Sequence, residues 1–115
     1  MATLYLPLKK EWYEMIESGI KTEEYRELKP YWVKRLCKDW VTRNLYVDCI
    51  NHCCMECINA RLYTVSQFEA IKFSYGYTQR TMTFECKGIT IGKGNIEWGA
   101  PDNDVFIIKL GKRID

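Results

Sequence analysis

Hydrophobic and polar positions alternate near both ends of the chain, and segments with a helical period lie mostly between them. Residues 3–8 alternate and are rich in β-forming side chains, which predicts a first strand. Residues 9–18 place Trp12 and Ile16 on one side and charged side chains on the other, which predicts an amphipathic helix. Gly19 follows directly, and it predicts the end of that helix because glycine accepts a positive φ without steric cost.

The next segment, residues 21–27, is dense in charge and is predicted to be a strand. Alternation in a strand places its side chains on two faces, Thr22, Glu24 and Arg26 on one and Lys21, Glu23 and Tyr25 on the other. Several charges in one short strand cost desolvation free energy unless they pair or face a wet cleft. The segment is therefore either a salt-bridged surface strand or the floor of a binding site.

Two further helices are predicted between residues 30 and 60. Pro30 suits the first position of a helix, and residues 31–40 keep a helical stripe that includes Leu36 and Trp40. Helical spacing of apolar residues also predicts a helix over about residues 45–60.

From residue 68 the period changes to two. Residues 68–75 and 80–91 alternate as strands, with Gly76 at the turn between them and Gly88 indicating a bulge or sharp bend. Residues 105–110 are almost continuously apolar, which is typical of a central strand covered on both faces.

This order of elements predicts an α+β fold with five or six strands. Closely spaced late strands with glycines at their bends favour a small, strongly bent sheet or a partly closed barrel. A chain of 115 residues is long enough for one modest core, so residues 1–115 are expected to form a single domain.

Charge and hydropathy narrow the class of protein. Seventeen basic and fifteen acidic residues give a net charge of +2, so any basic surface must come from arrangement in space. No apolar run approaches the roughly 20 residues that cross a bilayer, and the first residues are too short for a signal peptide. We therefore expect a cytoplasmic protein without a membrane partner.

Six cysteines are present, and four of them lie between residues 49 and 57. Without a secretion signal, reduced thiols are expected. A zinc site is the alternative, since residues of the types that bind zinc stand close together, Cys49, His52, Cys53, Cys54 and Cys57. They fall within one predicted helix without a second ligand pair, so a buried helix face is the main interpretation, and no metal or cofactor is expected.

A motif in the charged segment gives a resemblance to a known family. The pattern Gly19-x-Lys21-x-x-Glu24-x-Arg26 is similar to the G-x-K-x-x-E-x-R signature of the activating-signal-cointegrator homology (ASCH) domain. Further similar segments flank it in order, Lys29-Pro30-Tyr31-Trp32, Gly76-Tyr77, Gly88-Ile89-x-Ile91-Gly92 and Glu97-Trp98-Gly99-Ala100. The resemblance covers about residues 3–36 and 68–112 and leaves 37–67 as a helical insert. It implies a PUA-like β-barrel with two helices at one end and a cleft that contains the signature residues.

The resemblance also implies a function. The family is generally predicted to bind RNA, so RNA or a nucleotide-like ligand in that cleft is the main expectation. Some members resemble hydrolases that act on RNA or on modified nucleosides, and here Lys21 and Glu24 would be the reactive pair. One such branch, acting on acetylated cytidine, has threonine in place of Glu24, so its activity is not carried over. A third alternative is a protein-interaction module that uses residues 37–67.

Each candidate site residue has a structural alternative. Lys21 is expected to bind phosphate as a point charge or to act as a base, or else to be a surface lysine that favours the helix C-terminus. Glu24 and Arg26 are either a structural ion pair or a couple in which the guanidinium meets a phosphate or base edge.

Aromatic side chains are candidates for stacking on unpaired bases. Those assigned to this role are Tyr25, Trp32, Tyr77 and Trp98, whereas Trp12 and Trp40 are assigned to the core. Candidate phosphate contacts are Lys34, Arg35 and Arg80, although a solvated helix face explains the first two equally well.

Overall fold

The computed structural model describes residues 3–36 and 68–115. The chain divides into two compact units, residues 1–25 with 67–115, and residues 26–66. The first unit carries most of the sheet, the first helix and a short 3-10 helix, and it is the part on which the site depends.

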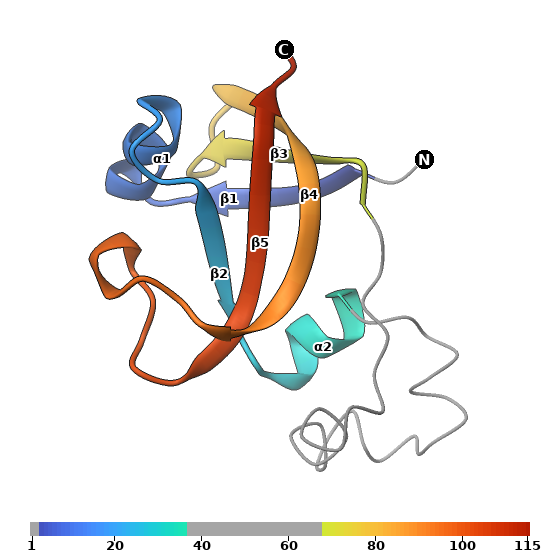
Figure 1. The fold of residues 1–115 in the computed structure, drawn as a ribbon. Helices are drawn as coiled ribbons and strands as arrows, with labels where there is room; N and C mark the ends of the chain where they lie inside the picture. The colour runs from blue at the N-terminus through green and yellow to red at the C-terminus, as the bar shows by residue number, and fades with distance from the viewer. Residues whose placement is uncertain (1–2, 37–67) are drawn as a thin grey trace. The chain divides into compact units, whose positions relative to one another are not determined.

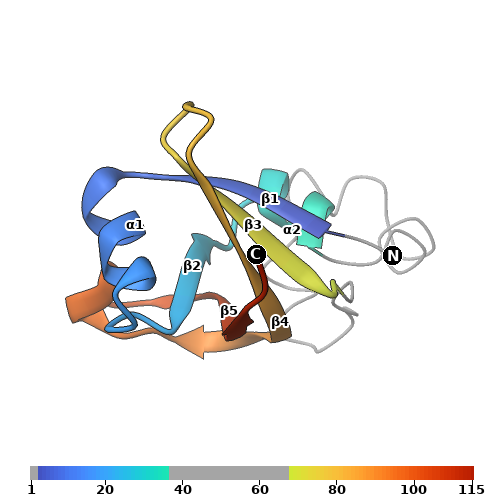
Figure 2. The same ribbon diagram turned by 90° about the horizontal axis from the view of Figure 1, so that it is seen from above.

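Within residues 3–36 and 68–115, five strands form one mixed sheet that curls into a half-barrel (Figures 1 and 2). In sheet order they are β1 (Thr3–Leu8), β3 (Ala70–Tyr75), β4 (Thr81–Lys93), β5 (Asp104–Arg113) and β2 (Glu23–Glu27). Strand β1 pairs with β3 in parallel, whereas β3 with β4 and β4 with β5 are antiparallel. The predicted α+β class and strongly bent sheet are confirmed, with the lower of the two expected strand numbers.

The bend of the sheet is concentrated in β4, the longest strand. Its pairing with β5 shifts register between Phe84 and Cys86 and again between Cys86 and Gly88. Gly88 has a φ of 140°, which a residue with a side chain rarely adopts. The bulge predicted at this glycine is therefore confirmed, and the strand curves along its length in Figure 1.

Strand β5 is the centre of the packing, as its apolar run predicts. Four successive side chains from Val105 to Ile108 are buried, so both faces of this strand are covered. Alternate residues of β1, β3 and β4 are buried as well, Leu4, Leu6, Leu8, Ile71, Phe73, Met82 and Phe84.

Helix α1 (Lys10–Glu17) packs on the sheet through a slightly different face from the predicted one. Its buried residues are Tyr13 and Ile16, whereas Trp12 is only half-buried. The Tyr13 ring meets the Tyr75 ring of β3 edge to face, with 5.2 Å between centroids. Gly19 follows the helix with a φ of 88°, in agreement with the predicted helix end.

In the second unit, helix α2 (Pro30–Leu36) begins at proline as predicted. The rest of the predicted 31–40 helix, the 45–60 helix and the cysteine and histidine segment lie outside the described residues, as does the surface of residues 37–67 suggested for a protein partner. Among the helices in the described ranges, none is both long and apolar enough to span a membrane.

Candidate functional site

Lys21 and Glu24 form a buried ion pair between α1 and β2. The Lys21 ammonium lies 2.7 Å from the Glu24 carboxylate, and the two residues are 2% and 4% exposed. The prediction that they lie on opposite faces of one strand is wrong, because β2 begins only at Glu23. Lys21 precedes the strand, and its N–H donates to the Met15 carbonyl at 3.0 Å, so strand alternation does not apply to it.

Two aromatic rings cover the Lys21 ammonium. Its nitrogen lies 4.6 Å from the centre of the Trp12 ring and 5.5 Å from that of Tyr25. Both distances are within the range of cation–π attraction, which strengthens when the cation is withdrawn from water. Trp12, assigned to the core from its position in the sequence, is half-buried and contacts this charge instead.

In a domain of this size, burying an ion pair has a large free-energy cost. Lysine and glutamate are rarely buried unless paired, and removing both charges from water costs free energy that their attraction offsets only partly. Apolar residues of similar volume often give equal or greater stability at such a position. The pair is therefore a stronger indicator of a functional site than an exposed ion pair would be.

Tyr25 connects β2 to the loop before β5. Its hydroxyl donates to the Glu23 carboxylate at 2.8 Å, which agrees with the predicted shared face of these two residues. The same oxygen accepts the Asn95 N–H at 3.0 Å. Both hydrogen-bonding functions of the hydroxyl are thus used, and the ring is held in place beside the Lys21 ammonium.

Two glycines allow this loop to pack closely on the aromatic rings. A Cβ atom on Gly94 would lie 2.6 Å from the Tyr25 ring, and one on Gly99 would lie 2.8 Å from the Trp12 ring. Gly99 also has a φ of 97°. Between them lies a 3-10 helix, η2 (Ile96–Trp98), so the loop reaches the two rings through backbone contacts that larger residues would prevent.

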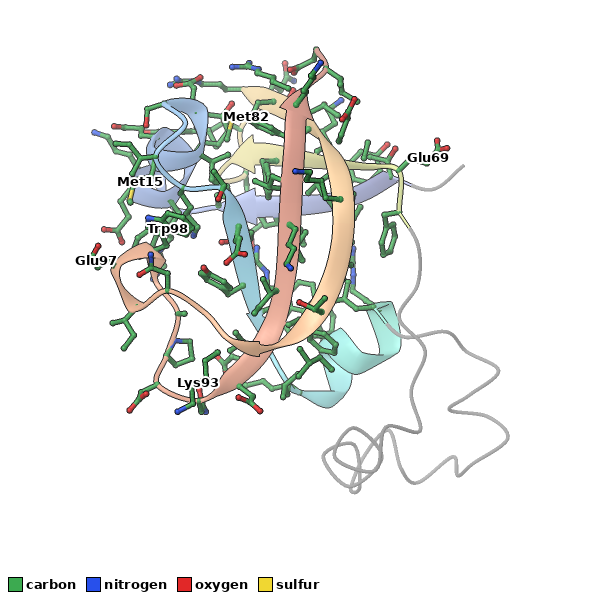
Figure 3. All side chains as sticks on the ribbon, viewed as in Figure 1. Met15, Glu69, Met82, Lys93, Glu97 and Trp98 are labelled. Carbon is green, nitrogen blue, oxygen red and sulfur yellow. The ribbon has the colours of Figure 1, made fainter. Side chains whose placement is uncertain are left out.

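Trp98 extends from η2 on the side of the sheet where α1 lies (Figure 3). It is half-buried and packs against a small apolar cluster formed by Tyr25, Ala100, Val105 and Ile107. Trp98 therefore shares Tyr25 with the Lys21–Glu24 pair, and these four predicted site residues belong to one connected group.

The protonation of Tyr25 gives a pH-dependent test of this packing. Burial raises the pKa of Tyr25 to about 12, helped by its bond to Glu23 and opposed by the bond from Asn95. The folded protein holds this proton more tightly than the unfolded chain. Its contribution to stability is therefore complete below pH about 10 and is lost as the pH rises through about 12.

We expect the unfolding free energy of the wild type to fall by about 2–3 kcal/mol more than that of Tyr25→Phe over this range. Urea unfolding of both proteins at several alkaline pH values measures the difference. Tyr5→Phe, which changes an exposed tyrosine of β1, is the control and should follow the wild type. A difference between wild type and Tyr25→Phe that does not vary with pH would contradict the stated environment of the hydroxyl.

Arg26 and Trp32 belong to the second unit and contact each other there. The Arg26 guanidinium lies 5.2 Å from the Trp32 ring centre, and that of Arg35 lies 5.7 Å from it. Tyr31, which is 60% exposed, meets Trp32 edge to face and accepts a hydrogen bond from Arg35 at 3.3 Å. The side chain of Lys34 lies outside what is described.

Tyr77 and Arg80 occupy the turn between β3 and β4, which projects from the sheet in Figure 2. Tyr77 is 96% exposed. Arg80 binds Glu17 of α1 at 2.9 Å and lies over the rings of Tyr13 and Tyr75. The described contacts therefore place Arg80 in a different cluster from the Lys21–Glu24 pair.

Several residues of these clusters carry no signal in the sequence that identifies them. Asn95 acts through its backbone N–H, so its side-chain type does not reveal the contact with Tyr25. Glu17 carries no such signal, because its partner Arg80, itself a predicted phosphate contact, is 63 positions away in the sequence. Trp12 lies seven residues before the signature glycine. Its contact with Lys21 could be predicted only if residues 18–22 were expected to form a turn and not a strand.

No family model, curated protein or solved structure matches this chain.

Proposed function

We propose that this protein is an ASCH-like domain of the PUA-like type that binds single-stranded RNA or a nucleotide beside the Lys21–Glu24 pair. The observation that carries the proposal is the burial of this ion pair beneath Trp12 and Tyr25. Two supports come from the chain itself, the G-x-K-x-x-E-x-R pattern and the curled five-stranded sheet, whose strand β2 carries Glu24.

The proposed roles follow from the chemistry of the side chains. Lys21 offers an ammonium to a phosphate or to a base carbonyl, and Glu24 fixes its position at 2.7 Å. Trp12 and Trp98 are half-buried, so each combines a fixed ring with an accessible part, which suits stacking on an unpaired base. We propose that the ligand reaches Lys21 from the side of Trp12.

In the second unit, the Arg26, Tyr31, Trp32 and Arg35 cluster is a separate candidate for RNA contact. An exposed tyrosine and two guanidinium groups at aromatic faces are the residue types that stack on bases and neutralise phosphates.

Titration with a short single-stranded RNA of mixed sequence tests the function. We expect binding that weakens as salt is raised, because phosphate contacts release counterions. Trp98→Ala should weaken binding by about tenfold or more at every salt concentration, since a lost stacking contact costs roughly 1–3 kcal/mol. Tyr5→Ala, which removes an exposed aromatic ring from β1, is the matched control and should bind as the wild type does.

Absence of binding by the wild type at low salt would rule out the proposed RNA function. Equal losses in Trp98→Ala and Tyr5→Ala would show that the RNA does not use the proposed site. Circular dichroism of each variant separates lost binding from lost folding.

A hydrolase acting on RNA or on an acylated nucleoside is the second candidate. The 2.7 Å contact between Lys21 and Glu24 favours it, because an amine and a carboxylate in hydrogen-bond contact can exchange a proton during a reaction. Incubation of the wild type with RNA and with acylated nucleosides, over a range of pH and divalent metals, distinguishes the candidates. Turnover that Lys21→Met abolishes supports the hydrolase, and binding without turnover supports the RNA-binding function alone.

A further inference from the structure

A second charged cluster lies at the end of the half-barrel where α1, the β3–β4 turn and the end of β5 meet (Figure 1). Glu17 is its centre. One carboxylate oxygen lies 2.9 Å from the Arg80 guanidinium, and the other lies 3.9 Å from that of Arg113. Asp115 accepts from the Nε of Arg113 at 2.8 Å, and the contact of this guanidinium with Glu17 is made by a terminal nitrogen, Nη1.

Beneath this cluster lies a tyrosine hydroxyl for which the described residues supply no partner in hydrogen-bonding geometry. Tyr13 is completely buried, and the Arg80 guanidinium lies near enough to its hydroxyl to lower its pKa as a hydrogen-bond donor would, but not in the geometry of a formed bond. The Arg80 guanidinium lies 5.2 Å from the centre of the Tyr13 ring. Buried hydroxyl groups nearly always have a partner, because an unsatisfied one costs free energy. The missing partner points to a ligand atom.

The surroundings of the Tyr13 hydroxyl are electrostatically mixed. Burial raises the pKa of Tyr13 above its ordinary value, and the negative charge of Glu17 adds to this effect. The positive charges of Arg80 and Arg113 act in the opposite sense, and so does the hydrogen-bonding interaction of the Arg80 guanidinium with the hydroxyl. All three charged side chains are thus close enough to act on the hydroxyl, which remains a neutral donor at physiological pH.

We propose that Arg80, Arg113 and the Tyr13 hydroxyl form a binding site for a phosphate group, and that Glu17 occupies this site when it is empty. A carboxylate and a phosphate both present pairs of oxygen atoms that guanidinium groups bind side by side. Glu17 therefore marks with its two oxygens the positions that two phosphate oxygens take. A third phosphate oxygen accepts from Tyr13.

The ion pairs that Glu17 makes are weak enough for a phosphate group to replace its carboxylate. The side chains of Arg80 and Glu17 are 54% and 33% exposed, and ion pairs of this kind contribute about 1 kcal/mol or less. The contact of Glu17 with Arg113 is at the limit of an ion pair. A phosphate brings more charge than the carboxylate and satisfies the buried hydroxyl as well, so it displaces Glu17 toward solvent.

Titration of the 115-residue protein with inorganic phosphate, followed through the arginine Nε–H signals in nitrogen-15 spectra, tests the site. Saturable shifts of Arg80 and Arg113 are expected. Arg80→Gln and Arg113→Gln should each weaken binding about tenfold or more, the loss that follows from removing charged hydrogen bonds. Lys109→Gln removes a charge from an exposed position of the same strand as Arg113 and should leave binding unchanged.

Glu17→Gln and Tyr13→Phe separate this proposal from a purely structural cluster. Glu17→Gln removes the internal competitor and should tighten phosphate binding about tenfold. Tyr13→Phe should weaken binding severalfold and, without phosphate, raise the melting temperature by about 5 °C, because it deletes an unsatisfied buried hydroxyl. Weaker binding by Glu17→Gln, unchanged binding by Arg80→Gln, or a lower melting temperature of Tyr13→Phe would overturn the proposal.

The source of the phosphate is distinguished by two versions of one short RNA, with a 5′-phosphate and with a 5′-hydroxyl. If the RNA with the 5′-phosphate binds more tightly, and Arg80→Gln removes this difference, the site binds a terminal phosphate. Equal binding of both, weakened by Arg80→Gln, identifies the RNA backbone. The inorganic phosphate titration does not depend on the Lys21–Glu24 site, so Lys21→Met/Glu24→Met should retain this binding even if the proposed RNA function fails.

Discussion

Replacing Lys21 by methionine should lower the free energy of unfolding by about 3–5 kcal/mol, the usual result of removing one partner from a buried ion pair. The substitution keeps most of the side-chain volume but withdraws the ammonium from the Glu24 carboxylate, which is 4% exposed. Since small domains are stable by about 5–15 kcal/mol, this loss is a large share of the total. Urea unfolding followed by circular dichroism measures it.

Two controls give this result its meaning. Lys29→Met breaks an ion pair with Glu27 at 3.1 Å in which both side chains are 62% exposed, and it should cost less than about 1 kcal/mol. The double variant Lys21→Met/Glu24→Met removes both buried charges and should recover most of the stability lost by Lys21→Met. A cost for Lys21→Met no larger than that for Lys29→Met would contradict the burial of the pair.

Replacing Gly99 by alanine should lower stability by about 2–5 kcal/mol. A side chain at a φ of 97° is strained by about 1–2 kcal/mol, and the new methyl group would also meet the Trp12 ring at 2.8 Å. Gly19→Ala is the matched control, because Gly19 has a φ of 88° and open space around its Cβ position. Gly19→Ala should therefore lower stability only by the conformational strain of about 1–2 kcal/mol.

Thermal and urea unfolding of the two alanine variants measure the difference between them. The stability that Gly99→Ala loses beyond the loss in Gly19→Ala measures the close packing of the loop on Trp12. The RNA affinity of Gly99→Ala should also fall, because Trp12 covers Lys21. Equal costs for the two substitutions would show that the loop does not press on this ring.

Local rules were sufficient to predict the strands because each of them has a strong pattern of its own. The apolar run in β5 requires burial on both faces, and the glycine in β4 permits the bend that curls the sheet. Each of these features is determined by residues close together in the sequence, so it can be predicted from the sequence alone.

The geometry of the site depends on contacts that no local pattern contains. The N–H of Lys21 binds the end of α1, and the carbonyl of Thr22 accepts from Leu110 in β5, so the strand starts later than its sequence suggests. The resulting turn brings Lys21 to Glu24, a pairing that strand alternation forbids. The G-x-K-x-x-E-x-R pattern contains both residues of the buried pair but does not give their relation in space.

The cluster around Glu17 also depends on contacts between residues far apart in the sequence, so no local pattern predicts it. Its partners come from the β3–β4 turn and from the end of β5. Arg80 was predicted as a phosphate contact, but nothing in the sequence connects it with Glu17 or Arg113. Tyr13 was missed because the predicted buried stripe of α1 ran through Trp12, one position away.

The most direct test of the proposed function is the affinity of Lys21→Met/Glu24→Met for single-stranded RNA, measured beside the wild type at low salt. This variant lacks both buried charges but is expected to stay folded, so lost binding cannot be attributed to unfolding. We predict that its affinity falls by at least about tenfold, since a charged contact to the ligand is worth roughly 1.5–3 kcal/mol. A folded double variant that binds RNA as tightly as the wild type would contradict the assignment of the Lys21–Glu24 pair to the binding site.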